Sequence, residues 1–448
     1  MINLYPHQQE SLNLTHDKNK VAYYLDMGLG KTFVGSEKMK LLNSQINLLI
    51  CQKSKIDDWF HHFVEYYGLE YRVLNITNKK EFELFMCGVE EVNKGVNPYK
   101  YVAIINYEMA FRRPYLLKLN NLTLMLDESS LIQNEKVKRS KFILKMKPDN
   151  VILLSGTPTS GKYEKLWSQV QLLGWRISKE LFWQHYVDVE WIEDGDSGFK
   201  RKHIIGYKNV DRLIKKLSDY GAVFMKSEEV FDLPQQVEQK IMISTTKAYR
   251  KFMRNSIITI ALSGSEFHDD SDFYGKDVTP RIELIGDLTL TKRLYARQLC
   301  GHYNNDKLEA FKDLIDSTED RLIVFYNFND ELDKMIKLIE DRPFSVINGD
   351  VKDLTAYDQE SNSVTFVQYQ AGAKGLNLQK ANKIVYFTLT QSCEDWMQSK
   401  KRIHRIGQEK TCFYYYLMCR NSVEEDVLKA LESGRDYTDD LFEKYKGE

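Results

Sequence analysis

The sequence predicts an α/β protein with two parallel sheets in tandem. Short apolar runs alternate with segments of helical spacing along most of the 448 residues, which is the pattern of parallel strands joined by covering helices. One series of apolar runs lies between residues 21 and 154, and a second lies between residues 322 and 418. The length is more than one small core needs, so we expect two or three domains.

A glycine-rich loop follows the first apolar run. Residues 21–25 (Val-Ala-Tyr-Tyr-Leu) predict a buried strand, and residues 33–39 predict the start of a helix. Between them lies Asp26-Met27-Gly28-Leu29-Gly30-Lys31-Thr32. Strand, glycine loop and helix in this order are the context in which a Gly-Lys-Thr sequence binds phosphate. Leu25 stands where the strict P-loop pattern has glycine, so an ordinary glycine-rich turn is the alternative.

The residues of this loop have expected roles at a nucleoside triphosphate. Gly28 and Gly30 allow the backbone to bend so that its N–H groups point at the phosphates. The N-terminus of the following helix adds a partial positive charge. Lys31 is expected to reach the β- and γ-phosphates, and the Thr32 hydroxyl is expected to bind Mg²⁺.

The other apolar runs of the first series each end in a polar stretch. Parallel strands present their carboxyl ends at one edge of the sheet, where α/β proteins bind ligands. That shared edge predicts one active site. The stretches are Gln52 and Lys53 after residues 47–51, Asn106 and Tyr107 after residues 102–105, Asp127 and Glu128 after residues 122–126, and Ser155-Gly156-Thr157-Pro158 after residues 151–154.

The paired carboxylates of Asp127 and Glu128 suit hydrolysis of a nucleoside triphosphate. Asp127 is expected to hold Mg²⁺ opposite Thr32. Glu128 is expected to orient and deprotonate the attacking water. A solvated acidic turn is the alternative, but so apolar a strand favours the functional interpretation.

The region between the two series is expected to contain an extension of the first domain and a linker to the second. Residues 182–221 mix aromatic and polar side chains and predict a helical extension of the first domain. Residues 245–261 are helical in character, and residues 264–276, rich in Asp, Ser and Gly, predict an exposed loop. The predicted domains are an N-terminal ATP-binding domain over residues 1–225, a linker and helical segment over residues 226–300, and a C-terminal domain with a terminal helix over residues 301–448.

The second series predicts another parallel sheet, without a phosphate loop of its own. Arg402 and Arg405, three positions apart, are expected to share a helix face. Two such arginines could be solvated or could bind phosphate. Because the first series supplies no arginine to the triphosphate site, an arginine-finger role is favoured. The predicted strands are residues 322–326, 345–349, 364–367, 383–387 and 412–418.

The bulk composition is that of an ordinary globular protein. Apolar residues make up 43% and charged residues 28%, and the formal net charge is −1, so the chain is not globally basic. A local basic cleft remains compatible with this charge. The six cysteines show no close pairing, so neither a zinc site nor a disulfide framework follows. No signal segment and no apolar run of membrane-spanning length is present, which predicts a cytoplasmic protein.

Taken in order, these blocks resemble the Swi/Snf-like branch of the superfamily-two helicases. The resemblance runs from Leu4 to about residue 430. The block over residues 398–408, Gln-x-x-x-Arg-x-His-Arg-Ile-Gly-Gln, is the most specific to this branch. The other blocks are Leu-x-Pro-x-Gln at 4–8, Met-Gly-Leu-Gly-Lys-Thr at 27–32, Asp-Glu at 127–128, Ser-Gly-Thr-Pro at 155–158 and Ala-Gly-x-x-Gly-Leu-Asn-Leu at 371–378.

The resemblance implies two RecA-like domains with ATP at their interface and DNA, usually duplex, across both. It implies that Gln8 reads adenine, and that Gly375 and Gln398 bind the nucleotide. It also implies that Asn377 senses nucleotide and DNA backbone, and that Arg402 and Arg405 complete the ATP site. Residues in blocks that contact or couple to the DNA backbone in the family are Lys53, Asn106, Tyr107 and Thr157.

Several positions depart from the family pattern. Leu25-Asp26 stands where the family usually has Asp-Glu, and Lys401 stands where many helicases have glycine. Ser129-Ser130 replaces the usual Ala-His after the acidic pair, and that histidine helps couple hydrolysis to movement in the family. The chain also has no room for the large helical insertions of nucleosome remodellers, which argues against a remodeller.

The sequence therefore predicts a monomeric ATP-dependent DNA translocase or helicase. Its compactness is similar to that of phage-encoded members, which implies a phage-type replication or recombination setting and protein partners from those processes. An RNA helicase is one alternative. An ATP-switched loading adaptor, which binds DNA without processive motion, is another. A nuclease is least favoured, since no separate nuclease domain fits in the remaining length.

Overall fold

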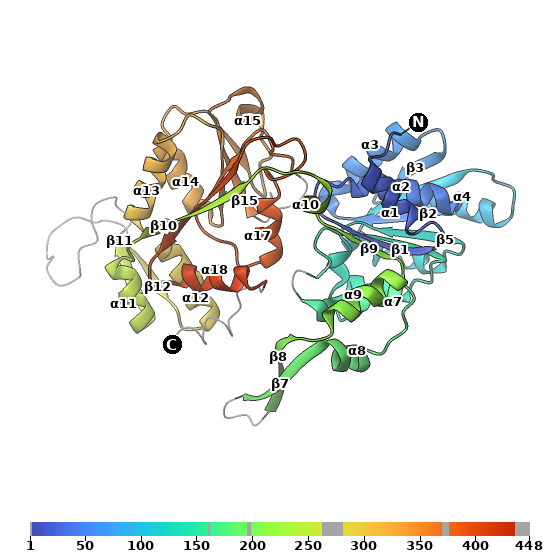
Figure 1. Ribbon diagram of the computed structural model, residues 1–448, viewed down its shortest axis with the longest axis horizontal. Coiled ribbons are helices and arrows are strands. Elements are labelled where there is room, and N and C mark those ends of the chain that lie inside the picture. The colour runs from blue at the N-terminus through green and yellow to red at the C-terminus, as the bar shows by residue number, and fades with distance from the viewer. Residues whose placement is uncertain (1, 160–161, 195–198, 262–280, 370–375, 435–448) are drawn as a thin grey trace. The chain divides into compact units, whose positions relative to one another are not determined.

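The computed structural model describes residues 2–159, 162–194, 199–261, 281–369 and 376–434. The chain forms two compact units, Met1–Asp232 and Leu233–Glu448, each built around its own parallel sheet (Figure 1). The predicted α/β fold with two parallel-sheet domains in tandem is confirmed. The predicted domain limits at residues 225 and 300 stay predictions; residues 233–300 belong to the second compact unit.

The first unit contains a seven-stranded sheet in the order β3-β4-β2-β5-β6-β1-β9. All its pairings are parallel, and β1 lies between β6 and β9. Its inner strands are buried on both faces, which explains their continuous apolar sequences. The strands are β1 (Lys20–Leu25), β2 (Ile46–Cys51), β3 (Tyr71–Asn75), β4 (Lys100–Asn106), β5 (Leu122–Leu126), β6 (Asn150–Leu154) and β9 (Ala222–Met225).

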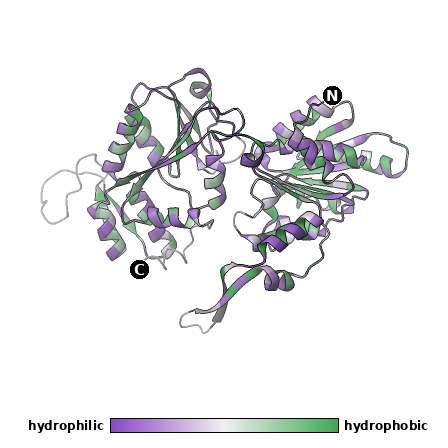
Figure 2. Ribbon diagram, in the orientation of Figure 1, coloured by the Kyte–Doolittle hydropathy of each residue, from purple (hydrophilic) through white to green (hydrophobic). Residues whose placement is uncertain are grey.

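Helices cover both faces of this sheet. One face carries a core that includes Leu12, Met39 and Phe63, and the other carries a core that includes Phe85 and Phe182. Figure 2 shows green and purple residues side by side on the helices, as expected for one buried and one solvated face. The helices are α1 (Pro6–Asn13), α2 (Lys31–Leu42), α3 (Ile56–Tyr67), α4 (Lys79–Asn93), α5 (Tyr107–Ala110), α6 (Lys138–Lys145), α7 (Trp167–Leu172), α8 (Lys179–Tyr186), α9 (Val210–Asp219) and α10 (Ser227–Val230), with short 3₁₀ turns η1 (Lys53–Lys55), η2 (Pro114–Lys118), η3 (Ser129–Ile132) and η4 (Tyr163–Leu166).

The predicted helical extension over residues 182–221 is wrong in its middle part. Helices α8 and α9 flank an antiparallel hairpin of β7 (Val187–Asp194) and β8 (Phe199–Tyr207). Apolar residues alternate in β7 at Val187, Val189 and Trp191, and this period of two defines a strand rather than a helix. Figure 1 shows the hairpin extending away from the sheet of the first unit.

The second unit contains a six-stranded parallel sheet in the order β10-β17-β16-β13-β15-β14. Immediately after the chain enters this unit, β10 pairs along its whole length with β17, from Gln236 opposite Cys412 to Ile243 opposite Cys419. The strands are β10 (Gln236–Ile243), β13 (Leu322–Tyr326), β14 (Phe344–Ile347), β15 (Val364–Gln368), β16 (Lys383–Tyr386) and β17 (Cys412–Cys419).

The prediction of a helix over residues 245–261 holds only as far as Asn255. Ser256 has a φ of +61°, which ends the helix and turns the chain into the antiparallel hairpin β11 (Ile257–Ala261) and β12 (Arg281–Ile285). The predicted loop over residues 264–276 lies outside the described residues. The helices of this unit are α11 (Lys247–Asn255), α12 (Thr289–Cys300), α13 (Asn305–Asp316), α14 (Asn329–Leu338), α15 (Thr355–Gln359), α17 (Cys393–Lys400) and α18 (Val423–Glu432). Among the described residues, no helix is long and apolar enough to cross a membrane.

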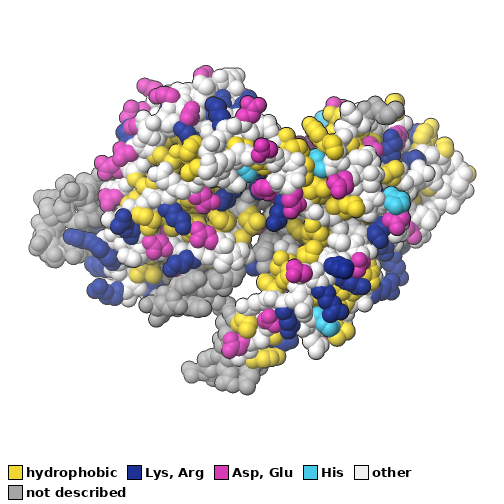
Figure 3. Space-filling model, viewed as in Figure 1, with side chains coloured by type: hydrophobic (Ala, Val, Ile, Leu, Met, Phe, Trp, Pro, Cys, Tyr) yellow, Lys and Arg dark blue, Asp and Glu magenta, His cyan; other side chains and the backbone are white. Residues whose placement is uncertain are grey.

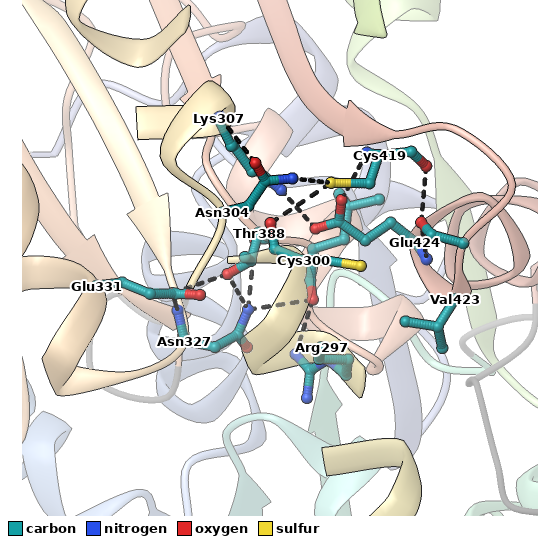
Figure 4. Close-up of polar contacts among 12 residues, drawn as sticks. Arg297, Cys300, Asn304, Lys307, Asn327, Glu331, Thr388, Cys419, Val423 and Glu424 are labelled. Carbon is teal, nitrogen blue, oxygen red and sulfur yellow. Dashed lines mark hydrogen bonds and ion pairs between the residues drawn. The ribbon is translucent and has the colours of Figure 1, made fainter. Parts of the chain in front are cut away.

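A buried ion pair joins α13 to α18 in the second unit (Figure 4). The Lys307 ammonium lies 2.5 Å from a Glu424 carboxylate oxygen, and both side chains are almost completely buried. The other carboxylate oxygen accepts the Cys419 backbone N–H at 2.8 Å. Cys300 and Cys419 place their thiols beside the same carboxylate, but burial raises the pKa of the Cys300 thiol well above its usual value. A lysine partner for the carboxylate and a raised pKa of the Cys300 thiol suit a structural contact rather than a bound cation.

We expect Lys307→Met to destabilise the second unit by about 3–5 kcal/mol, because it leaves the Glu424 carboxylate buried without its cation. Chemical denaturation followed by circular dichroism measures the loss. Lys312→Met is the control, since this lysine pairs with Asp316 and Glu340 at the surface, where solvent screens the pair and its loss should change stability little. Equal losses in the two variants would contradict a structural role for the buried pair.

Candidate nucleotide site

The glycine loop connects β1 to α2 through two residues in the left-handed region. Gly28 has a φ of +89° and Gly30 a φ of +74°, and Gly30 is the N-terminal cap of α2. A Cβ atom at Gly30 would lie 2.0 Å from the Gln8 side-chain nitrogen, so a side chain there would force the Gln8 amide to move in addition to straining the backbone. The loop therefore directs the N-terminus of a twelve-residue helix toward the carboxyl edge of the sheet.

Lys31 holds its ammonium across the end of β1. The Nζ atom donates to the carbonyl oxygens of Leu25, at 2.8 Å, and Asp26, at 3.2 Å. It also lies close to Gly156, where an added Cβ would be 3.3 Å from Nζ. Because Gly156 follows β6, the ammonium lies between the ends of two neighbouring strands. Thr32 is half-buried in the first turn of α2.

The acidic pair ends β5, which lies on the other side of β6 from β1. One Asp127 carboxylate oxygen accepts the Trp59 indole N–H at 2.7 Å, and the other accepts the Glu128 backbone N–H at 3.0 Å. Burial raises the pKa of Asp127, an effect opposed by the Trp59 hydrogen bond and by the positive charge of Lys31. Glu128 has a φ of +50°, so the chain turns sharply where the strand ends.

Trp59 and Tyr107 position this acidic pair. Trp59 is buried on α3 and stacks on Phe63, and its indole N–H donates to Asp127. The Tyr107 hydroxyl donates to the Asp127 carbonyl oxygen at 2.8 Å. Asn106 is also buried, and its amide donates to a Glu108 carboxylate oxygen at 3.0 Å.

Gln169 of α7 connects three parts of the site and was not singled out by the sequence. Its amide oxygen accepts the Tyr24 hydroxyl at 2.9 Å and the Ser129 hydroxyl at 2.8 Å. Its amide nitrogen donates to the Pro158 carbonyl oxygen at 3.3 Å. This buried amide thus links β1, the residue after the acidic pair and the Ser-Gly-Thr-Pro loop, which contains Thr157.

The remaining predicted residues of the first unit differ in exposure. Lys53 is exposed in η1, at the end of β2. Gln8 is buried; its amide oxygen accepts the Tyr5 backbone N–H, and its nitrogen donates to the Leu29 carbonyl oxygen at 3.3 Å. Gln8 therefore supports the glycine loop from α1, and its adenine contact stays a prediction.

The second-unit block over residues 398–408 does not form one helix. Helix α17 ends at Lys400, and residues 401–407 form turns, so the predicted shared helix face of Arg402 and Arg405 is wrong. Gln398, buried on α17, donates to a Glu394 carboxylate oxygen at 3.0 Å. Arg402 is buried and donates to the Leu376 carbonyl oxygen at 2.8 Å.

Arg405 is placed differently from Arg402. Its guanidinium is half-buried, burial lowers its pKa, and it has no hydrogen-bond or ion-pair partner among the described residues. An arginine that stabilised its own domain through a carboxylate would show such a partner. Asn377 is exposed, and Gly375 lies outside the described residues.

Family comparisons agree with this arrangement of blocks. Residues 7–301 match the model of the SNF2-related domain, and residues 306–407 match that of the helicase conserved C-terminal domain. The chain belongs to the SNF2-related family. The predicted Swi/Snf-like resemblance is confirmed, and with it the assignment to helicase-type ATPases at the level of the family.

SNF2-related relatives are distant and longer. The chain is 22% identical, over 91% of its length, to the mouse SWI/SNF-related matrix-associated actin-dependent regulator of chromatin subfamily A member 1, of which it covers 40%. It is 24% identical over 90% of its length to the Arabidopsis thaliana ATP-dependent DNA helicase DDM1, covering 56% of that protein. It is 26% identical over 70% of its length to yeast DNA repair and recombination protein RAD26, covering 30% of it. The chain therefore spans roughly a third to a half of the length of these relatives.

One solved structure aligns with most of the chain. The Sulfolobus solfataricus SWI2/SNF2 ATPase core in complex with dsDNA aligns with 96% of this chain and 91% of its own, at 17% identity and a TM-score of 0.44.

We expect Gly30→Ala to destabilise the first unit of this SNF2-related chain by more than Gly95→Ala does. Both glycines have a φ near +70°, which costs alanine about 1–2 kcal/mol. Only the Gly30 substitution also presses on Gln8, because no atom lies within 4 Å of a Cβ at Gly95. Denaturation curves measure the difference.

The same substitution in a Gln8→Ala background is the control for the contact. There the cost of Gly30→Ala is expected to fall to that of Gly95→Ala, because the clashing amide is gone. Equal costs of Gly30→Ala in both backgrounds would show that Gln8 does not press on the loop.

Proposed function

We propose that this chain is an ATP-dependent DNA translocase that hydrolyses ATP at the carboxyl edge of its first sheet. The observation that carries the proposal is the convergence of three charged or polar stretches on neighbouring strands. Lys31 lies at the end of β1, Gly156 follows β6, and Asp127 and Glu128 end β5. A phosphate-binding helix N-terminus beside two carboxylates is the composition of a nucleoside triphosphatase site.

Asp127 and Thr32 would hold Mg²⁺. The Asp127 carboxylate is buried, and its raised pKa reflects the cost of ionising it away from water. A divalent cation would offset that cost, and carboxylate and hydroxyl oxygens are the ligands Mg²⁺ takes in proteins. When bound, Mg²⁺ would neutralise charge on the phosphates.

The chain's own residues would perform the remaining steps. Lys31 would exchange its bonds to the Leu25 and Asp26 carbonyl oxygens for phosphate oxygens. Glu128 would take a proton from the attacking water, and Trp59 would keep Asp127 oriented throughout. Gln8, through its bonds to the loop backbone, would place the adenine next to α1.

DNA is the nucleic acid along which we propose that the chain moves. Relatives named as a DNA helicase and as a DNA repair and recombination protein support this choice. The proposed contacts with the DNA backbone are Lys53, Thr157 and Asn377, of which Lys53 and Asn377 are exposed. Tyr107 is buried and would act through its bond to the Asp127 carbonyl oxygen, whereas the buried Asn106 amide binds Glu108. We further propose that the chain works as a monomer in the cytoplasm, with replication or recombination proteins of a phage-type system as its partners.

An ATP-switched loading adaptor is the second candidate function. The observation that favours it is Ser130, at the position where the family usually has histidine. Ser130 is buried, and its hydroxyl has no hydrogen-bond partner among the described residues, so it supplies no link from hydrolysis to movement. Displacement of a triplex-forming strand from duplex DNA separates the two, because a translocase removes the strand on ATP addition and an adaptor does not.

The proposal is tested by ATP turnover with duplex DNA, single-stranded DNA and RNA. We expect duplex DNA to stimulate turnover most, and we expect Lys31→Ala to abolish turnover while the protein stays folded. Lys31 is only half-buried, so its loss removes phosphate-binding charge and little packing. Lys94→Ala, on an exposed lysine at the end of α4, is the control and should retain full turnover. Normal turnover by folded Lys31→Ala would exclude the site, and preferential stimulation by RNA would indicate an RNA helicase.

We expect Arg405→Ala to lower DNA-stimulated turnover by roughly 10³-fold or more, the range for arginines that stabilise phosphoryl transfer. ATP affinity should fall much less. Arg405→Lys should restore little, because an ammonium lacks the forked donors of a guanidinium. Arg420→Ala, on an exposed arginine after β17, is the control. A loss explained by a lower melting temperature of Arg405→Ala would assign Arg405 a structural role.

A further inference from the structure

A groove runs between α8 and the β7–β8 hairpin of the first unit, away from the candidate nucleotide site. Its volume is about 730 Å³, which is the size of a site for a small ligand or a few linked groups. Side chains on α8 form one wall and side chains on the hairpin form the other. The lining that matters is Lys179 and Trp183 on α8, with Val189, Trp191, Lys202 and Ile205 on the hairpin.

Large apolar side chains are exposed in this groove. Trp191 is 58% exposed and Ile205 is 61% exposed. Figure 3 shows hydrophobic and charged side chains next to one another on the described part of the hairpin. An exposed aromatic patch bordered by charged side chains is typical of a surface that binds a ligand or another macromolecule.

Each wall pairs an indole ring with a lysine. Trp191 lies directly opposite Lys202 in the hairpin register, and the Lys202 ammonium is 5.2 Å from the ring centroid. On α8, the Lys179 ammonium is 5.6 Å from the Trp183 ring centroid. Flat rings next to ammonium groups are the combination that binds a nucleic acid strand, because bases stack on the rings while phosphates face the cations.

Charge pairing within the groove leaves Lys202 available. Lys179 pairs with Glu135 at 2.5 Å, and Lys208 pairs with Asp188 at 3.0 Å. Among the described residues, Lys202 has no carboxylate partner.

We propose that this groove binds an unpaired stretch of nucleic acid, with a base stacked on Trp191 and a backbone phosphate beside Lys202. An unpaired strand is required, because the faces of duplex bases are already stacked on their neighbours. This proposal rests on the proposed function. It adds a single-stranded ligand to the duplex DNA along which the motor would move.

Fluorescence anisotropy with a labelled oligothymidylate, without ATP, tests the proposal. Trp191→Ala should weaken binding by about tenfold or more, the effect of losing one stacking platform. Trp191→Phe should keep most of the affinity, because it keeps a ring. Lys202→Gln should reduce the slope of log affinity against log salt by about 0.7, the contribution of one phosphate contact on a single strand. An oligouridylate arm shows whether DNA or RNA is preferred.

Tyr115→Ala is the matched control. Tyr115 is 57% exposed and has the Lys118 ammonium 5.1 Å from its ring centroid, but it does not line this groove. It should bind the oligonucleotide as the wild-type protein does. Unchanged oligonucleotide affinity in a folded Trp191→Ala protein would overturn the groove proposal and leave a protein partner as its occupant.

Duplex-stimulated ATP turnover of the wild-type protein separates the two proposals. Absent turnover with every nucleic acid would defeat the proposed motor, whatever the oligonucleotide result. Stimulated turnover together with unchanged oligonucleotide binding by Trp191→Ala would defeat only the groove.

Discussion

The left-handed turn of the glycine loop determines where the charged groups of the first unit lie. Gly28 and Gly30 both have positive φ, and the turn they form sends α2 back from the end of β1. Lys31 can therefore fold across the strand end onto the Leu25 and Asp26 carbonyl oxygens. Gln8 packs so closely on this turn that a side chain at Gly30 would have to displace its amide. Displacing the turn would separate the ammonium from the acidic pair that ends β5.

Hydrogen bonds fix the positions of the acidic pair and of the Ser-Gly-Thr-Pro loop. Trp59 holds the Asp127 carboxylate, Tyr107 holds its backbone carbonyl, and Gln169 joins Ser129 to the Pro158 carbonyl oxygen. A shift of the acidic pair would therefore move the Ser-Gly-Thr-Pro loop through the buried Gln169 amide. Such a link offers a route from hydrolysis to the proposed DNA contact at Thr157, even though serine replaces the histidine usual in the family.

Local patterns predicted the central strands of both sheets, because parallel strands buried on both faces have continuous apolar sequences, but they missed the edge strands β3 and β9 of the first sheet. They also missed the edge strand β10, half of whose residues are exposed, and the β7–β8 hairpin, whose apolar residues alternate with period two. Polar stretches at strand ends indicated which groups meet at the sheet edge. The partners Trp59 and Gln169 could not be predicted from local sequence. They lie 68 and 40 positions from Asp127 and Ser129, and only the order of strands in the folded sheet brings them into contact. The helix face assigned to Arg402 and Arg405 failed because α17 ends at Lys400.

The most direct test of the account is a crystal structure of the chain with a non-hydrolysable ATP analogue and Mg²⁺. The account predicts that the Lys31 ammonium leaves the Leu25 and Asp26 carbonyl oxygens and donates to β- and γ-phosphate oxygens. It also predicts that Trp59 keeps its hydrogen bond to Asp127 while that carboxylate faces the cation. An analogue bound away from the glycine loop, with Lys31 still donating to Leu25, would contradict it.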